Sequence, residues 1–147
     1  MSAAFDDGPV TYDEAVSGFS LQSLAAKLSG SLESGLNACI ECCDRHVAGG
    51  GIALEWESHT GRRGSYTFGQ IQEMAARCAG LLASQGIRPG DVVAGMLPRT
   101  PALLSVILGT WRLGAIYQPL FTAFGPKAID DRLAFSGAKL AITDSVN

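Results

Sequence analysis

Three short apolar segments that alternate with amphipathic helical patterns constrain the fold of this chain more than any other feature. The segments begin near Val92, Ala115 and Lys139, and they recur at a nearly constant interval. Continuous apolar strands separated by helices are typical of a parallel sheet with right-handed crossovers. The sequence therefore predicts an α/β fold in which a βαβαβ doubly wound parallel sheet forms the second half of the chain.

The helix expected before the first of these strands carries the clearest local signal. Thr67 and Gln70 form a Thr-x-x-Gln capping box, which begins a helix at this point. Gly86 supplies the left-handed residue that ends it. Two further helices are expected to begin at Pro101 and Pro126, because proline is favoured at the first helical position.

The first half of the chain shows weaker patterns. Residues 1–18 have no sustained period, and no structure is assigned to them. Apolar spacing and turn signals predict two helices and one hairpin, over residues 21–30, 36–47, and 52–56 paired with 65–67. We therefore divide the chain into a lead-in segment with one helix, residues 1–35, and the start of a larger domain, residues 36–147.

The last predicted strand lies directly before the end of the chain. No closing helix follows it, so at least one face or edge of the sheet would remain uncovered. This pattern predicts a fragment of a larger domain rather than a complete one.

Charge and apolar patterning exclude several classes of partner. The net charge is −3, which is too acidic for a surface that binds the phosphates of a nucleic acid. The apolar stretch over residues 102–121 is interrupted by Gly109, Arg112 and Pro119, so we interpret it as a helix and a strand rather than a membrane span. Four unevenly spaced cysteines fit no disulfide framework, and together with the absence of a leader sequence they predict a reducing, cytoplasmic setting.

A cluster of thiols and an imidazole permits two interpretations. On one helix, Cys39, Cys42 and His46 would share a face and could offer three ligands to zinc. Alternatively these residues and Cys43 fill space in a buried core, as free cysteines commonly do. Because no fourth ligand lies nearby, we favour the core and assign no metal site.

Other chemistry-bearing motifs are weak. Neither a G-x-G-x-x-G nor a Walker-type phosphate loop is present, and His46 and His59 have no interpretable nucleophile partner, so no catalytic residue is assigned. Residues 122–127 could cradle a phosphate but fit a helix cap better. Ligands are expected at the carboxyl ends of the strands, around residues 97–100, 121–125 and 143 onward.

Several strings in this sequence resemble the AMP-forming acyl-CoA synthetases of the adenylate-forming superfamily. The resemblance is continuous over residues 37–144, and its firmest parts are Tyr-Thr-Phe at 66–68, the turn at 86–91, and GAIYQPL at 114–120. The stretch CCDRH at 42–46 and the turn at 121–126 are similar to the acetyl-CoA and short-chain acyl-CoA synthetases in particular.

The resemblance implies an ATP-dependent acid–thiol ligase that activates acetate or another short-chain carboxylate as acyl-AMP and transfers it to coenzyme A. ATP, Mg²⁺ and coenzyme A would serve the full-length enzyme, and none is expected to bind this fragment. The family's phosphate loop, adenine motif and catalytic lysine match no position here, so the fragment is not expected to be active. The alternative is a non-catalytic α/β module that binds a nucleotide or a protein.

The resemblance also implies one contact with ligand. The corresponding turn of these enzymes faces the thiol arm of coenzyme A, and it comprises Phe121, Thr122, Ala123, Phe124 and Gly125 in this chain. Capping of the following helix is an equally adequate explanation of the turn, because glycine followed by proline is favoured where a helix begins. The expected partners are small molecules, without nucleic acid or membrane, and the remainder of the synthetase would cover the open sheet.

Overall fold

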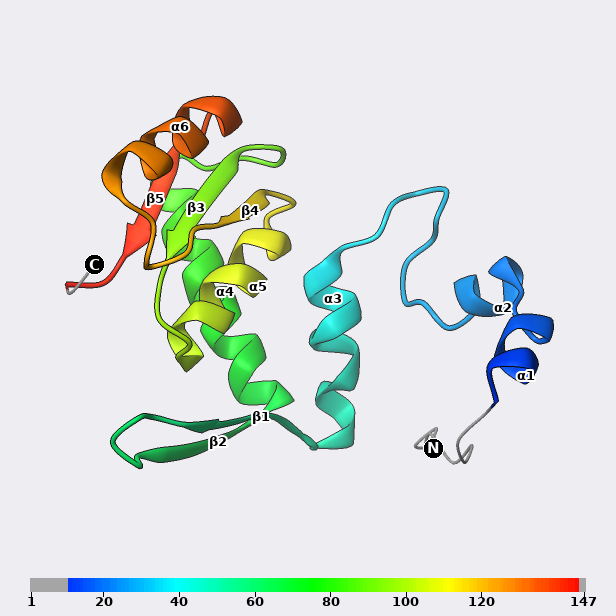
Figure 1. Ribbon diagram of the computed structural model, residues 1–147. Helices are drawn as coiled ribbons and strands as arrows, with labels where there is room; N and C mark the ends of the chain where they lie inside the picture. Colours follow the sequence, from blue (N-terminus) through cyan, green and yellow to red (C-terminus); the bar gives the residue numbers. More distant parts are fainter. Residues whose placement is uncertain (1–10, 146–147) are drawn as a thin grey trace. The chain divides into compact units, whose positions relative to one another are not determined.

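The computed structural model describes residues 11–145 and consists of two units, Met1–Leu36 and Asn37–Asn147 (Figure 1). The described part of the first unit, residues 11–36, contains two short helices, α1 (Tyr12–Ser17) and α2 (Leu21–Ala25), neither of which has a buried residue. No helix within the described part of the chain is both long enough and apolar enough to cross a membrane.

Helix α1 contradicts the expectation that residues 1–18 have no structure. A capping box begins the helix, because the Glu14 backbone N–H donates to Thr11 Oγ1 at 3.4 Å and the Thr11 N–H donates to Glu14 Oε2 at 2.9 Å. The rest of that expectation, over residues 1–10, lies outside the described residues. Helix α2 is shorter than predicted because Leu21 and Leu24 remain exposed, so no core stabilises a further turn.

The second unit contains the predicted α/β elements in the predicted order. A short helical region and a hairpin come first, followed by helices that alternate with strands. The elements are α3 (Ala38–Cys42), the 3₁₀ helix η1 (Asp44–Gly49), β1 (Ile52–Glu57), β2 (Arg63–Thr67), α4 (Phe68–Ser84), β3 (Val92–Met96), α5 (Pro101–Arg112), β4 (Ile116–Pro119), α6 (Pro126–Ser136) and β5 (Leu140–Thr143).

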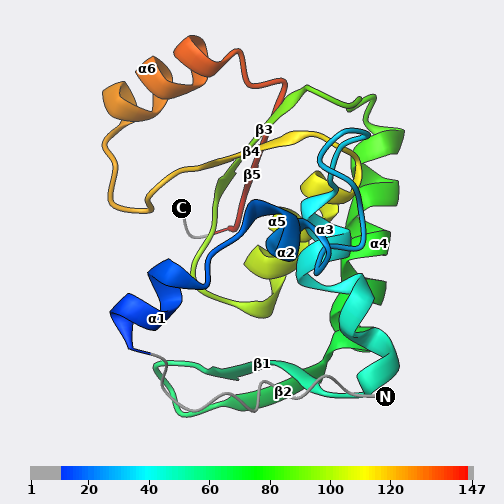
Figure 2. The ribbon, with the colours of Figure 1, turned by 90° about the vertical axis from the view of Figure 1, so that its right-hand side faces the viewer.

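Strands β4, β3 and β5 form the predicted parallel sheet, in that order, and Val93 lies opposite both Tyr117 and Leu140. The chain passes from β3 to β4 on one side and then crosses back to β5 on the other. Right-handed crossovers therefore place α5 and α6 on opposite faces of the sheet. Figure 2 shows α4 and α5 on one side and α6 on the other, which confirms the doubly wound arrangement.

Helix α4 begins as its capping box predicts. Gln70 N–H donates to Thr67 Oγ1 at 3.2 Å, and Thr67 N–H donates to Gln70 Oε1 at 2.8 Å. Thr67 is also the last residue of β2, which pairs antiparallel with β1. Gly86 has a φ of 86°, the left-handed conformation predicted for the residue that closes this helix.

Helices α4 and α5 approach each other closely where α5 carries a glycine. A Cβ atom added to Gly109 would lie 2.8 Å from Cys78 Cβ and 3.0 Å from the Ala75 carbonyl oxygen. Buried residues of this unit form two apolar clusters. The first contains Cys39, Cys43, Ile71, Ala75 and Leu108, and the second contains Leu82, Ile87, Val93 and Ala115.

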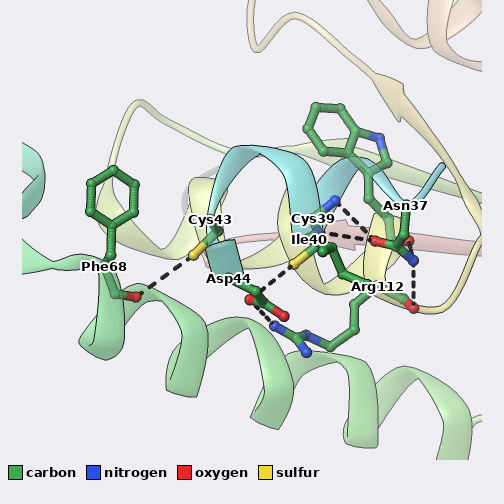
Figure 3. A network of polar contacts seen from close by, with 8 residues as sticks. Asn37, Cys39, Ile40, Cys43, Asp44, Phe68 and Arg112 are labelled. Carbon is green, nitrogen blue, oxygen red and sulfur yellow. Dashed lines mark hydrogen bonds and ion pairs between the residues drawn. The ribbon is translucent and has the colours of Figure 1, made fainter. Parts of the chain in front are cut away.

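One side chain joins the start of α3 to the end of α5 (Figure 3). The Asn37 side-chain oxygen accepts hydrogen bonds from Cys39 N–H at 3.0 Å and Ile40 N–H at 3.3 Å. Its Nδ2 donates to the carbonyl oxygens of Trp111 at 3.0 Å and Arg112 at 3.2 Å. The amide thus adds hydrogen bonds to backbone groups at both helix ends, where intrahelical partners become fewer.

The close approach at Gly109 predicts that a single added methyl group destabilises the protein. Gly109→Ala would place that methyl against backbone and Cβ atoms, so we expect the free energy of unfolding to fall by about 1–3 kcal/mol, the usual cost of overpacking. Urea unfolding followed by circular dichroism measures this change.

The matched control is Gly80→Ala in α4, where an added Cβ would meet no atom within 4 Å. This variant should raise the free energy of unfolding by about 0.5–1 kcal/mol, because alanine loses less backbone entropy than glycine in a helix. Equal stabilisation by both substitutions would contradict the close contact between α4 and α5.

Candidate functional site

The carboxyl ends of the three parallel strands meet at one edge of the sheet. Gly95 of β3 lies opposite Pro119 of β4 and Ile142 of β5, so the segments that follow these strands leave from the same side. The segment after β3 leads to α5 on one face, and the segment after β4 leads to α6 on the other. Doubly wound folds bind ligands outside the carboxyl ends of their strands, which is the edge that these segments share.

The segment after β4 contains the predicted site residues, and hydrogen bonds define its shape. Leu120 is buried and donates its N–H to the Gly95 carbonyl oxygen at 2.8 Å. The Phe124 N–H then donates to the Phe121 carbonyl oxygen at 3.0 Å, which closes a turn. Thr122 and Ala123 form the exposed tip of this turn.

Two aromatic side chains of this turn contact each other. The rings of Phe121 and Phe124 lie 5.8 Å apart, with an angle of 80° between their planes, which is the favoured edge-to-face arrangement. Phe121 is 62% exposed although it is a large apolar residue, whereas Phe124 is half-buried. The turn therefore presents an aromatic surface at the edge of the sheet where ligands are expected.

Gly125 occupies the N-cap position of α6 and precedes Pro126 at the first helical position. Its φ of −71° is accessible to any residue, and an added Cβ would meet no atom within 4 Å. Neither backbone conformation nor packing among the described residues therefore requires glycine at this position.

The segment after β3 is held by a residue that the sequence analysis did not single out. Trp56 of β1 donates its indole N–H to the Arg99 carbonyl oxygen at 2.9 Å. Beside this contact is an apolar hollow of about 260 Å³, lined by Leu54, Trp56, Arg99, Thr100, Leu103, Leu104 and Ile107. The only sign of this role in the sequence is the indole N–H of Trp56, because a tryptophan whose ring is packed needs a hydrogen-bond acceptor for that group.

The predicted helix over residues 36–47 is wrong because α3 ends at Cys42. Cys43 has a φ of −132° and a ψ of −64°, and a 3₁₀ helix follows it. The break accompanies an ion pair in which Arg112 lies 2.6 Å from Asp44, as Figure 3 shows. As a result, Cys39, Cys42 and His46 do not lie on one face of one continuous helix.

The prediction that the thiol cluster belongs to the core holds for two of its members. Cys39 and Cys43 are 0% and 1% exposed, but Cys42 and His46 are exposed. Burial raises the pKa of the Cys39 thiol, and it raises the pKa of Cys43 to about 11. Both buried thiols are therefore protonated at neutral pH and are not available as thiolates.

His46 instead packs against an aromatic ring, with its ring 5.1 Å from that of Phe68. Across residues 11–145, no group of three or more His, Cys, Asp or Glu side chains is arranged to hold a metal ion.

Comparison with known proteins gives one family match and several similar proteins. Residues 44–147 match the family described as AMP-binding enzyme. The chain is 38% identical, over 111 residues, to an acetyl-coenzyme A synthetase of Psychromonas ingrahamii, and this match covers 74% of the chain. It is 35% identical, over 127 residues, to acetyl-coenzyme A synthetase 2 of Kluyveromyces lactis, a match that covers 78% of the chain.

Among solved structures, an acyl-CoA synthetase of Brucella canis is 52% identical to the chain, with a TM-score of 0.89. That match covers 92% of this chain and 25% of the Brucella protein. The matches to the two acetyl-coenzyme A synthetases cover 17% and 19% of those proteins, so the chain spans less than a fifth of their length.

The burial of the thiols predicts their order of reactivity. A thiol-alkylating reagent added to the native protein should label Cys42, because only its side chain in this cluster is exposed. Cys39 and Cys43 should remain unlabelled until denaturant is added, since burial blocks access and raises both pKa values. Peptide mass spectrometry locates the label, and rapid native labelling of Cys43 would contradict this packing.

Proposed function

This chain belongs to the AMP-binding enzyme family, and we propose that it is the N-terminal part of an ATP-dependent acid–thiol ligase. In the first half-reaction a carboxylate attacks the α-phosphorus of ATP, forming acyl-AMP and releasing pyrophosphate. In the second, the thiol of coenzyme A attacks the acyl carbon, and AMP leaves. The similarity to the Brucella acyl-CoA synthetase, which extends over 92% of the chain, carries this proposal.

The proposed acid is acetate or another short-chain carboxylate. Both curated relatives described above are named acetyl-coenzyme A synthetases, which supports acetate. The more similar solved structure has the broader name acyl-CoA synthetase, so the proposal includes acids somewhat longer than acetate.

In this proposal the chain supplies a scaffold and one ligand-facing turn. Residues 1–35 form the lead-in segment, and residues 36–147 form the start of the large domain, before its phosphate loop. ATP and Mg²⁺ would be held by residues outside this chain. Further chain would cover the side of α6, where Phe135 is 96% exposed.

The test of this function uses the longer protein that contains the chain. With ATP, Mg²⁺, coenzyme A and either acetate, propionate or butyrate, it should form AMP, pyrophosphate and the acyl-CoA. The 147-residue chain alone should release no pyrophosphate above the level of buffer. If mass measurement shows that the natural protein is only 147 residues long, the alternative of a non-catalytic binding module is favoured instead.

We assign the turn that comprises Phe121, Thr122, Ala123, Phe124 and Gly125 to the coenzyme A side of the site. Its position at the carboxyl edge of the sheet supports this assignment. So does the exposure of Phe121, a large apolar side chain of which 62% is exposed. The open space beside Gly125 leaves room for a ligand to approach the backbone.

This assignment predicts a selective defect in Gly125→Val. An added Cβ would meet no atom within 4 Å, so the melting temperature should fall only slightly, because valine is a poorer N-cap residue than glycine. The KM for coenzyme A should rise about tenfold, equivalent to about 1.4 kcal/mol of binding. ATP–pyrophosphate exchange with the acid should stay near wild type, because this half-reaction does not involve coenzyme A.

Gly49→Val is the matched control, since an added Cβ there also meets no atom within 4 Å and Gly49 lies outside the turn. It should leave both half-reactions unchanged. If Gly125→Val lowers both half-reactions together with the melting temperature, the turn serves only to cap α6.

A further inference from the structure

The turn over residues 121–125 has little buried surface of its own to fix its shape. Four of its five residues are exposed, and only Phe124 is half-buried. Helix α6, which follows the turn, has no buried residue either. Few buried apolar contacts therefore restrain the turn, which leaves a larger role to the specific contacts that its residues make.

The most direct of these contacts comes from Arg132 of α6. Its guanidinium carbon lies 4.1 Å from the centre of the Phe124 ring, which is a cation–π contact. One guanidinium nitrogen donates to the Ala128 carbonyl oxygen at 2.9 Å, which fixes the side chain along the helix. Within residues 11–145, no carboxylate forms an ion pair with Arg132, so its charge is shared between the Phe124 ring and the Ala128 carbonyl oxygen.

The backbone of Arg132 connects α6 to β4, the strand before the turn. Gln118 of β4 donates its side-chain N–H to the Arg132 carbonyl oxygen at 3.1 Å. Ser136 in turn donates to the Gln118 side-chain oxygen at 2.8 Å. The two ends of the turn are therefore joined through Arg132, since β4 enters the turn and α6 leaves it (Figure 1).

From these contacts we infer that Arg132 is a positioning residue, which orients Phe121 for coenzyme A by holding Phe124 against α6. The Arg132 guanidinium contacts the Phe124 ring, and the edge-to-face contact between Phe124 and Phe121 transmits that constraint to the exposed ring. The inference rests on the proposed function for the identity of the ligand, but the contacts among the three side chains do not depend on it.

The side-chain chemistry predicts a graded response to substitution. Arg132→Gln removes the charge and the planar guanidinium, whereas Arg132→Lys keeps the charge but loses the flat group that stacks on a ring. In the full-length protein, Arg132→Gln should raise the KM for coenzyme A about two- to fivefold, the range expected for an exposed cation–π contact. Arg132→Lys should give a smaller increase, and ATP–pyrophosphate exchange should be unchanged in both variants.

A second measurement reports the turn directly, without any ligand. 4-Fluorophenylalanine is placed at position 121 of the full-length protein, and its ¹⁹F resonance is compared in the wild type and in Arg132→Gln. We expect the resonance to narrow and shift in the variant because the ring gains freedom. Arg77→Gln is the matched control, since it removes an arginine from an exposed pair with Glu73 on α4 and should change neither the spectrum nor the KM.

The outcomes distinguish the positioning role of Arg132 from the identity of the ligand. An unchanged ¹⁹F spectrum in Arg132→Gln would overturn the positioning role, whatever the activity. A changed spectrum with an unchanged KM for coenzyme A would overturn the link between the turn and this ligand. Failure of the wild-type protein to form any acyl-CoA would refute the proposed function and the coenzyme A role of Arg132, while the spectra still decide whether Arg132 holds the turn.

Discussion

The close contact between α4 and α5 is the constraint on which the rest of the second unit depends. At Gly109 the helices approach so closely that a Cβ atom would lie 3.0 Å from the Ala75 carbonyl oxygen. Helix α4 follows the hairpin directly, and α5 connects β3 to β4, so their spacing sets the position of the hairpin relative to the sheet. Asn37 extends the same constraint to α3 by binding the last carbonyl groups of α5.

Local sequence signals predicted the elements whose causes are themselves local. The capping box at Thr67 and the proline at position 101 each act within one turn of helix, and both helices begin where expected. The same kind of signal was present at Thr11 and Glu14, but the prediction relied on apolar periodicity, which a six-residue exposed helix does not have. The break at Cys43 has no local signal, because the Asp44 carboxylate beside it pairs with Arg112, 68 residues later in the chain.

At the candidate site, too, some features have local causes and others depend on residues far apart in the sequence. Alternation of strands and helices predicts which segments lie at the carboxyl edge, because parallel strands must all end there. The contacts that shape these segments join residues far apart in sequence, such as Trp56 with the Arg99 carbonyl oxygen, and periodicity contains no information about them. The cysteine cluster shows the same limit, since the sequence indicates a buried face but not that Cys42 lies outside it.

Helix α6 differs from α4 and α5 in what holds it, and this difference bears on function. Four residues of α4 and six of α5 are fully buried, whereas α6 has none, so burial of an apolar face stabilises the first two helices more than the third. Contacts of Gln118 with Arg132 and Ser136 and of Arg132 with Phe124 join α6 to β4 and to the turn instead. Such directional contacts fix an orientation at low cost in buried area, and the loss of one cannot be compensated by repacking. The geometry of the turn beside the proposed ligand therefore depends on a few side chains, among them Gln118 and Arg132.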